Sequence, residues 1–551
     1  RAALERAIVS VPDDQRSAPR LALAQFYFAH LFAAETIAVL DTIAQQDPVS
    51  AGQPSFHALR GAACLLVEDL KCAADELGQH SLDGDEEAEL WRADLAGETG
   101  NAEAAAQGFL DGVGILPLYP HALRVRFALD AVRAMLASGR PQMAGPLIDM
   151  VLKDHPTPSE LAMTTFLEGR VALASGQLND ALKLWHETAA MNDPPSRARA
   201  LYARALAMLA ANRASPAETV KSLDEIRFLW RGDRFEFELL KKLGEMQLAQ
   251  GDPAAGLDAL QEAVTYFPDE PEAKAVAKET SDAFADLFLG KHGDDLAPLK
   301  ALVLYDQFHD LEPVGDRRDA IVKRLVDRLV QVDLLDRAAG LLDTQVTERL
   351  QGLDKARGAT QLALLRLMDH EPDTAIKALD LDVGTDLPAD LVRQRQQLRA
   401  RAMTELGKPQ DALALIANDP SRDADRLRAD IYWRGHDWKN AAETLGRLAG
   451  TPPTDGKLDA DTGRIVLSLA AALTLEDDQA GLTKLRAAYG PAMAASSYAK
   501  AFDVLAGSGT SANAKDPSAL ANQVAQIGDL QSFMASYGDK SGNETKAATV
   551  N

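Results

Sequence analysis

Apolar and small residues recur along this chain at spacings of three and four, the period of an α-helix with one buried face. The clearest example is residues 166–194, where two such runs follow one another. Gly169 lies on the apolar face of the first run, and Ala181 and Trp185 lie on that of the second. Gly176 separates the runs, and glycine permits the left-handed backbone that often follows a helix. The stretch therefore predicts two helices joined by a tight turn.

The same helix–turn–helix pattern recurs along most of the chain, at steps of about 37 residues in several places. We recognise seven repeats before residue 270 and four more from about residue 319. Sustained alternation of polar and apolar residues, which would indicate strands, is absent. The pattern predicts an all-α protein, built as a solenoid of about eleven helical hairpins in two segments.

Breaks in the pattern suggest the domain boundaries. Residues 290–294 interrupt the repeats, and residues 507–515 have the composition of a flexible linker. Between them, the fading periodicity predicts helices at about 463–475, 479–489 and 493–505. The predicted order is an N-terminal array (1–270), a helical junction (271–317), a second array (318–455), C-terminal helices (456–506), the linker (507–515), an amphipathic helix (516–537) and a disordered tail (538–551).

The amphipathic helix predicted at 516–537 carries Leu520, Val524 and Ile527 on one side. Two roles are open for it. It could cap the last repeat, since a solenoid needs a covered end. It could instead lie in a groove of its own chain or of a neighbouring molecule.

The hairpin pattern resembles the tetratricopeptide repeat, a helical hairpin of about 34 residues. That family has a small residue at position eight, glycine near fifteen, alanine at twenty, an aromatic residue at twenty-four and proline near thirty-two. The corresponding residues here are Gly169, Gly176, Ala181, Trp185 and, one place before Pro194, Asp193. The resemblance implies a right-handed superhelix whose concave groove, lined by the first helix of each hairpin, binds a protein or peptide.

A narrower resemblance joins the chain to long alphaproteobacterial tetratricopeptide proteins of the cell envelope. It rests on phrases such as RLRADIYWRGHDW at residues 426–438. The resemblance implies a periplasmic location and a missing N-terminal region, which fits a chain that begins at Arg1. It supplies no functional residues.

Composition narrows the classes of partner. The net charge is −24 and the sequence pI is near 4.9, so the surface repels the phosphates of nucleic acids and of anionic membranes. Eighteen uninterrupted apolar residues, enough to span a membrane, occur nowhere. We therefore expect neither nucleic-acid binding nor membrane insertion within this chain.

The two cysteines, Cys64 and Cys72, fall on the two helices of one predicted hairpin. Both lie among apolar residues, so we expect two buried free thiols in preference to a disulfide. Scarce cysteine does not indicate a compartment.

A search for chemistry finds no catalytic, cofactor-binding or metal-binding motif. The ten histidines lack the spacing that places two ligands on one helix face. The stretch GTPPTDGK at 450–457 has one residue too many between its glycines for a phosphate loop, and Leu458 stands where Ser or Thr would bind magnesium. We therefore predict a protein that is not an enzyme and needs no cofactor.

The repeat frame also selects candidate groove residues. They form a basic and apolar strip in an acidic protein, suited to an acidic or C-terminal peptide because guanidinium groups pair with carboxylates. The alternative is that these cations neutralise acidic neighbours of their own chain. The candidates are Arg126, Leu129, Arg133, Phe166, Arg170, Arg199, Tyr202 and Lys241.

The functional prediction is a scaffold or adaptor of the bacterial cell envelope that binds a protein or peptide. It would serve in the periplasm within a multi-protein machine, for example a flagellar motor. The alternative is a cytoplasmic peptide-binding regulator or co-chaperone.

Overall fold

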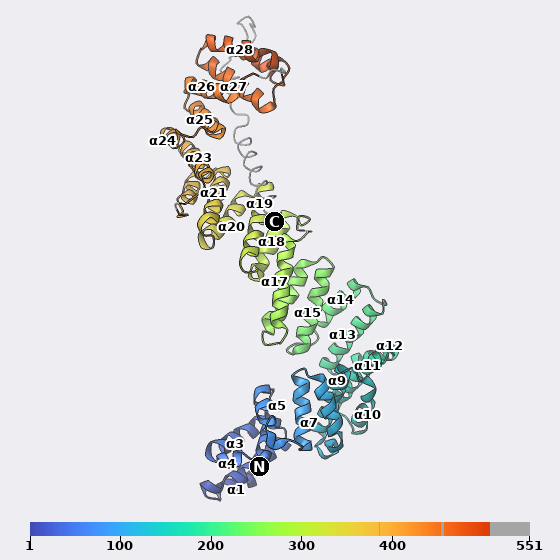
Figure 1. Ribbon diagram of the computed structural model, residues 1–551. Helices are drawn as coiled ribbons and strands as arrows, with labels where there is room; N and C mark the ends of the chain where they lie inside the picture. Colours follow the sequence, from blue (N-terminus) through green and yellow to red (C-terminus); the bar gives the residue numbers. More distant parts are fainter. Residues whose placement is uncertain (292, 385, 453–456, 507–551) are drawn as a thin grey trace. The chain divides into compact units, whose positions relative to one another are not determined.

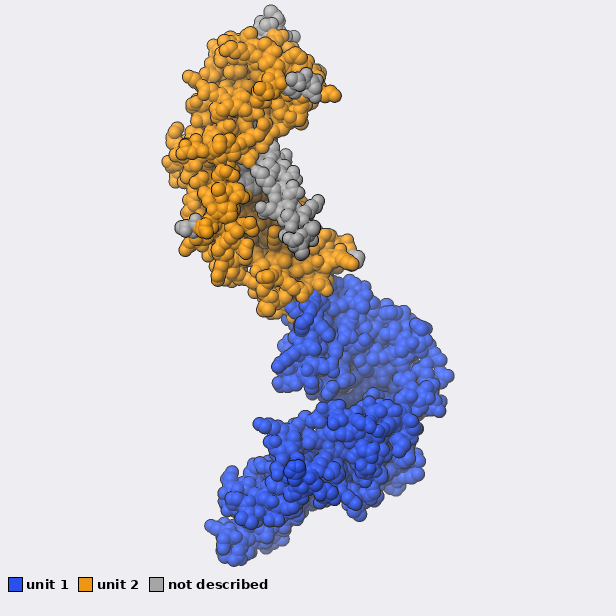
Figure 2. Space-filling view, viewed as in Figure 1, with its two compact units in different colours: residues 1–283 blue, residues 284–551 orange. Residues whose placement is uncertain are grey.

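The computed structural model describes residues 1–291, 293–384, 386–452 and 457–506 (Figure 1). These residues form 29 α-helices and no strand, which confirms the all-α prediction. The short 3-10 helices are η1 (Asp13–Gln15), η2 (His80–Leu82), η3 (Val113–Leu118), η4 (Pro141–Met143) and η5 (His309–Leu311). The chain divides into two compact units, Arg1–Ala283 and Phe284–Asn551, coloured in Figure 2 and treated separately below.

Unit 1 is a succession of helical hairpins in which each helix packs on its sequence neighbours. Its helices are α1 (Ala2–Val9), α2 (Ser17–Ala29), α3 (Ala33–Gln46), α4 (Pro48–Ala51), α5 (Pro54–Leu66), α6 (Leu70–Leu77), α7 (Glu86–Glu98), α8 (Ala102–Gly112), α9 (His121–Ala137), α10 (Gly145–Lys153), α11 (Pro158–Ala174), α12 (Leu178–Ala190), α13 (Pro194–Ala210), α14 (Pro216–Ile226), α15 (Arg234–Ala249) and α16 (Pro253–Tyr266).

Helix α17 (Ala273–Leu289) runs across the division between the units, and unit 2 continues with further hairpins. Its helices are α18 (Pro298–Phe308), α19 (Asp316–Gln331), α20 (Leu335–Glu348), α21 (Gly352–Met368), α22 (Pro372–Leu379), α23 (Ala389–Glu405), α24 (Pro409–Leu415), α25 (Arg422–Arg434), α26 (Trp438–Ala449), α27 (Ala460–Leu475), α28 (Gln479–Ala494) and α29 (Ala499–Ala506).

Small residues let the two helices of a hairpin approach closely. A Cβ atom placed on Gly169 of α11 would lie 2.5 Å from Nε1 of Trp185 on α12, so only glycine fits there. The indole Nε1 donates a hydrogen bond to the Phe166 carbonyl oxygen at 3.1 Å, which satisfies a buried donor. Gly244 of α15 likewise leaves room for the side chain of Leu260 on α16. The structure thus confirms the predicted succession of closely packed helical hairpins.

A residue with left-handed backbone occurs in the turn of every hairpin that the structure describes. Glycine fills this place in five turns, and seven turns use a residue with a side chain. One of the seven is Asp477, which joins α27 to α28 and identifies a twelfth hairpin that the sequence pattern did not reveal. In chain order the twelve are Leu31, Glu68, Gly100, Gly139, Gly176, Asn212, Gly251, Asp333, His370, Gly407, His436 and Asp477.

The expectation of two free thiols is wrong, because Cys64 and Cys72 form a disulfide. Cys64 lies near the end of α5 and Cys72 in the first turn of α6. The tight turn around Glu68, whose φ is +64°, brings the two Cα atoms to 5.8 Å, within the range that a disulfide can bridge. Sequence spacing alone did not reveal that the two side chains face each other.

The C-terminal helices also differ from the prediction. Helix α28 does not end at 489 but continues through Pro491 to Ala494, and α29 begins only at Ala499. Proline normally disrupts a helix interior, but Ala492 and Met493 are buried in the core of unit 2, and their packing keeps the helix intact. The predictions for 507–515, 516–537 and 538–551 lie outside the described residues. No helix in the described ranges is both long and apolar enough to cross a membrane.

Candidate partner-binding face of unit 1

The first helices of four successive hairpins, α9, α11, α13 and α15, lie side by side in unit 1. Helix α11 packs on both α9 and α13. The rings of Tyr202 on α13 and Phe235 on α15 meet edge to face with 5.4 Å between their centroids. We call the surface formed by these helices the first-helix face. All eight candidate groove residues come from these four helices, and Figure 2 shows that the surface of unit 1 is hollowed.

The two candidate arginines of α9 are engaged by carboxylates of their own chain. Arg126 Nη2 lies 3.1 Å from Asp94 Oδ2, and Arg126 Nε lies 3.6 Å from Asp130 Oδ2. Arg133 pairs with the other oxygen of Asp130. Asp94, on α7, is only 2% exposed; burial, reinforced by Asp130 and opposed by Arg126, raises its pKa to about 7. Burial, followed by repulsion from Asp130, also raises the pKa of Glu98.

Two further candidate cations are likewise paired. Arg199 forms an ion pair with Asp233 and lies over the Phe235 ring, 5.3 Å from its centroid. Lys241 Nζ lies 2.6 Å from Glu272 Oε2, and the hydrogen bond raises the pKa of the ammonium. For Arg126, Arg133, Arg199 and Lys241, the structure therefore supports the alternative, that they neutralise neighbouring carboxylates.

Leu129 and Phe166 do not line an open groove. They are only 8% and 7% exposed and belong to the apolar core shared by successive hairpins. The repeat frame predicted that both line the concave groove. A large apolar side chain there turns into the contact between helices, where its burial is favourable.

Arg170 on α11 is the candidate that remains open. It is exposed, and none of the described residues accepts a hydrogen bond from it or lies within ion-pair distance. Surrounding protein nevertheless lowers its pKa by desolvation, an effect that Glu238 opposes and Arg133 reinforces. Arg170 therefore offers an exposed guanidinium group on the first-helix face.

Tyr202 lies on α13, the next helix of the first-helix face after α11. It is half-buried, and no described residue forms a hydrogen bond with its hydroxyl. Burial, together with the charges of Glu238 and Glu245, raises its pKa to about 12, so the hydroxyl stays protonated and can donate.

The acidic members of this face were missed at the sequence level. Asp130 follows Arg126 by four residues and precedes Arg133 by three, and this spacing could have predicted the pairing. Glu238 and Glu245 come from α15, and their approach to Arg170 and Tyr202 depends on packing between hairpins. No local sequence signal reports that proximity.

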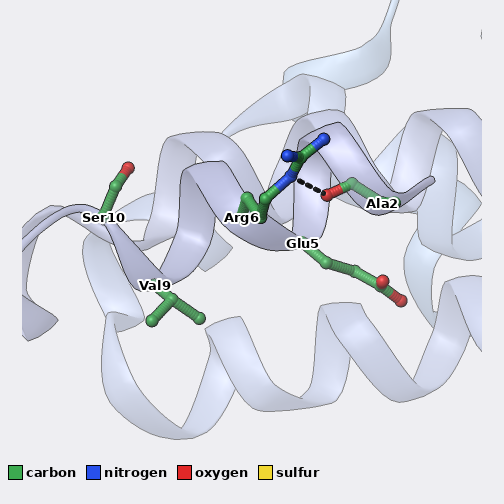
Figure 3. Close-up of a pocket in the computed structure, with 5 residues that line it drawn as sticks. All are labelled: Ala2, Glu5, Arg6, Val9 and Ser10. Carbon is green, nitrogen blue, oxygen red and sulfur yellow. Dashed lines mark hydrogen bonds between the residues drawn. The ribbon is translucent and has the colours of Figure 1, made fainter.

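The described residues offer no site for a metal, because they contain no group of three potential ligands close enough to share an ion. A shallow surface on α1, drawn in Figure 3, is lined by Ala2, Glu5, Arg6, Val9 and Ser10. Arg6 Nε donates to the Ala2 carbonyl oxygen at 3.1 Å, so its only drawn hydrogen bond stays within the helix. Since every lining residue comes from α1 or the residue that follows it, we assign no chemistry to this surface.

No protein-family model matches the chain, and no curated protein matches it either. Solved structures with a similar arrangement include a human IFIT1 dimer with m7Gppp-AAAA, at 13% identity and a TM-score of 0.33, covering 64% of this chain and 78% of that chain. The TPR domain of P58(IPK) is 15% identical with a TM-score of 0.26, covering 77% of this chain and 99% of that chain. Yeast Tom70 is 13% identical with a TM-score of 0.24, covering 86% and 100% respectively.

Proposed function

We propose that this tetratricopeptide-like solenoid is a non-enzymatic scaffold that holds an acidic segment of a protein partner on the first-helix face of unit 1. The observation that carries the proposal is Arg170, an exposed guanidinium without an ion pair among the described residues. A desolvated cation gains most from a bidentate carboxylate, because hydrogen bonds and charge then act together. The Tyr202 hydroxyl, on the neighbouring helix α13, donates to the same partner.

We further propose that the scaffold works in an oxidising compartment, the bacterial periplasm. The Cys64–Cys72 disulfide supports this location, since structural disulfides persist in such compartments and are rare in the cytosol. It weighs against the alternative of a cytoplasmic regulator or co-chaperone. In the periplasm, a long array of hairpins suits a component of a multi-protein envelope machine, such as a flagellar motor.

Affinity capture from the native cells tests the proposal. The baits are the wild-type full chain, Arg170→Glu, and Lys221→Glu as a matched charge reversal of an exposed cation on α14. We expect one partner to be retained by wild type and by Lys221→Glu, and to be lost from Arg170→Glu. Equal recovery on all three baits would contradict the assigned face.

The compartment is tested separately by alkylating free thiols in intact cells before lysis. Mass spectrometry of the peptides that contain Cys64 and Cys72 should find both residues disulfide-bonded and unalkylated. Complete alkylation would refute the oxidising compartment and leave the binding proposal standing.

A further inference from the structure

The helices on the two sides of Arg170 carry side chains of opposite charge. Helix α11 packs between α9 and α13, and α13 contacts α15 through the rings of Tyr202 and Phe235. Arg133 of α9 repels the Arg170 cation, whereas Glu238 of α15 attracts it. Neither side chain is within ion-pair distance of Arg170, so the guanidinium keeps its hydrogen-bonding capacity for a ligand. The first-helix face is thus basic toward α9 and acidic toward α15.

The acidic end of this gradient is available to a ligand. Glu238 and Glu245 have side chains 51% and 39% exposed. Among the described residues, each forms an ion pair only with a cation of its own helix, Arg234 at 3.4 Å and Lys242 at 3.3 Å. Exposed pairs of this kind contribute little free energy, so a partner's cation can replace them at small cost.

Tyr202 lies on α13, the helix between the basic and the acidic ends of this face. Its pKa is affected by both Glu238 and Glu245, while α13, which carries it, lies between α11 and α15. The ring rests edge-on against Phe235, which fixes its position. The tyrosine therefore offers an apolar ring with a donor hydroxyl between a cation and two carboxylates.

We propose that this face recognises a protein segment in which an acidic residue stands close to a basic residue. The acidic side chain pairs with Arg170, and the basic side chain lies against Glu238 and Glu245. A run of acidic residues is disfavoured, because its second carboxylate would meet the carboxylates of α15. The inference rests on the proposed function and specifies the chemistry of its partner.

The test uses the full chain and three fluorescent twelve-residue peptides of equal length. The first has two Asp–Lys pairs, the second replaces each Lys by Asp, and the third replaces each Asp by Asn. Binding is followed by fluorescence anisotropy at low salt for wild type, Arg170→Gln, Glu238→Gln and Lys221→Gln. Circular dichroism and thermal unfolding verify that each variant is folded.

We expect the Asp–Lys peptide to bind wild type and Lys221→Gln equally, and Arg170→Gln at least tenfold more weakly. Glu238→Gln should weaken binding of the Asp–Lys peptide, because it removes the attraction for the peptide's lysine. The same substitution should strengthen binding of the all-Asp peptide, because it removes the repulsion of the peptide's second carboxylate. If the all-Asp peptide binds wild type as tightly as the Asp–Lys peptide, the mixed-charge inference is overturned and the acidic-segment function stands. If no peptide depends on Arg170, both are overturned.

Discussion

Asp94 on α7 and Arg126 on α9 form an ion pair, with 3.1 Å between Oδ2 of the aspartate and Nη2 of the arginine. Asp94 is buried, with only 2% of its surface exposed. Arg126 is shared with Asp130, so two carboxylates compete for one cation. The pair therefore holds a carboxylate in an environment that favours its protonated form, as the raised pKa of Asp94 indicates.

This relationship makes stability depend on pH. The pKa of Asp94 is raised from 3.8 to about 7, so the folded state binds this proton more tightly than the unfolded state does. The contribution is fully present below the unfolded pKa and is lost as pH rises from about 4 to about 7. Asp94→Asn should match wild type at about pH 3.5 and exceed it at pH 8, by up to about 4 kcal/mol in the free energy of unfolding.

Denaturant unfolding of both proteins at the two pH values measures this difference. Asp258→Asn, at an exposed position of α16, is the control and should change stability equally at both. An Asp94→Asn effect that is independent of pH would contradict the assigned environment.

The disulfide should contribute measurably to the stability of unit 1. Closing the short loop between Cys64 and Cys72 removes conformational freedom from the unfolded chain, for a stabilisation of about 2–3 kcal/mol. The Cys64→Ala/Cys72→Ala variant should therefore melt at a lower temperature than oxidised wild type. Adding reductant should lower the melting temperature of wild type and leave the double variant unchanged; an unaltered wild type would argue against the bond.

The left-handed turn residues predict a pair of opposite substitutions. His370 has φ +60° and Gly176 has φ +80°, in turns at the same place in their hairpins. Since a side chain disfavours this conformation, His370→Gly should stabilise the protein and Gly176→Ala should destabilise it, each by about 1 kcal/mol. Melting curves that move in the same direction for both variants would show that the backbone is not the cause.

Replacing a glycine inside a helix by alanine should have opposite effects on stability at two positions of this fold. Gly169→Ala places a Cβ 2.5 Å from Trp185 Nε1 and should cost about 1–3 kcal/mol by overpacking. Gly340, inside α20, has open space where a Cβ would stand. Gly340→Ala should therefore stabilise by about 0.5–1 kcal/mol through helix propensity. Thermal unfolding compares the two, and equal effects would contradict the close contact at Gly169.

The sequence predicted the hairpins because their signals are local. Gly169 and Trp185 are separated by one tight turn, and their spacing already places them on facing sides of two helices. The same logic placed a break between residues 475 and 479 but did not identify the flanking helices as a hairpin, because Asp477 and not glycine adopts the left-handed backbone there. It also expected α28 to end before Pro491, because local propensity does not include the burial of Met493.

The site was predicted less well, because it depends on contacts between hairpins. The repeat frame assigned both Arg170 and Phe166 to the groove, yet Arg170 is exposed and Phe166 is buried in the core. Only the packing between hairpins decides which of these side chains remains exposed to solvent. Two ion pairs join residues of successive hairpins that are more than thirty positions apart, and the pattern within one repeat does not predict them. They are Arg199 with Asp233 and Lys241 with Glu272.

The most direct measurement places a photo-crosslinking amino acid at position 202, replacing Tyr202, in cells that make the protein naturally. Illumination should join the chain to a single protein partner, and the additional substitution Arg170→Glu should abolish the adduct without lowering the amount of folded protein. The same crosslinker at Lys221 of α14 should yield no adduct with that partner. An adduct at position 202 that persists in Arg170→Glu, or one that forms only at position 221, would contradict the claim that the first-helix face holds the partner through Arg170.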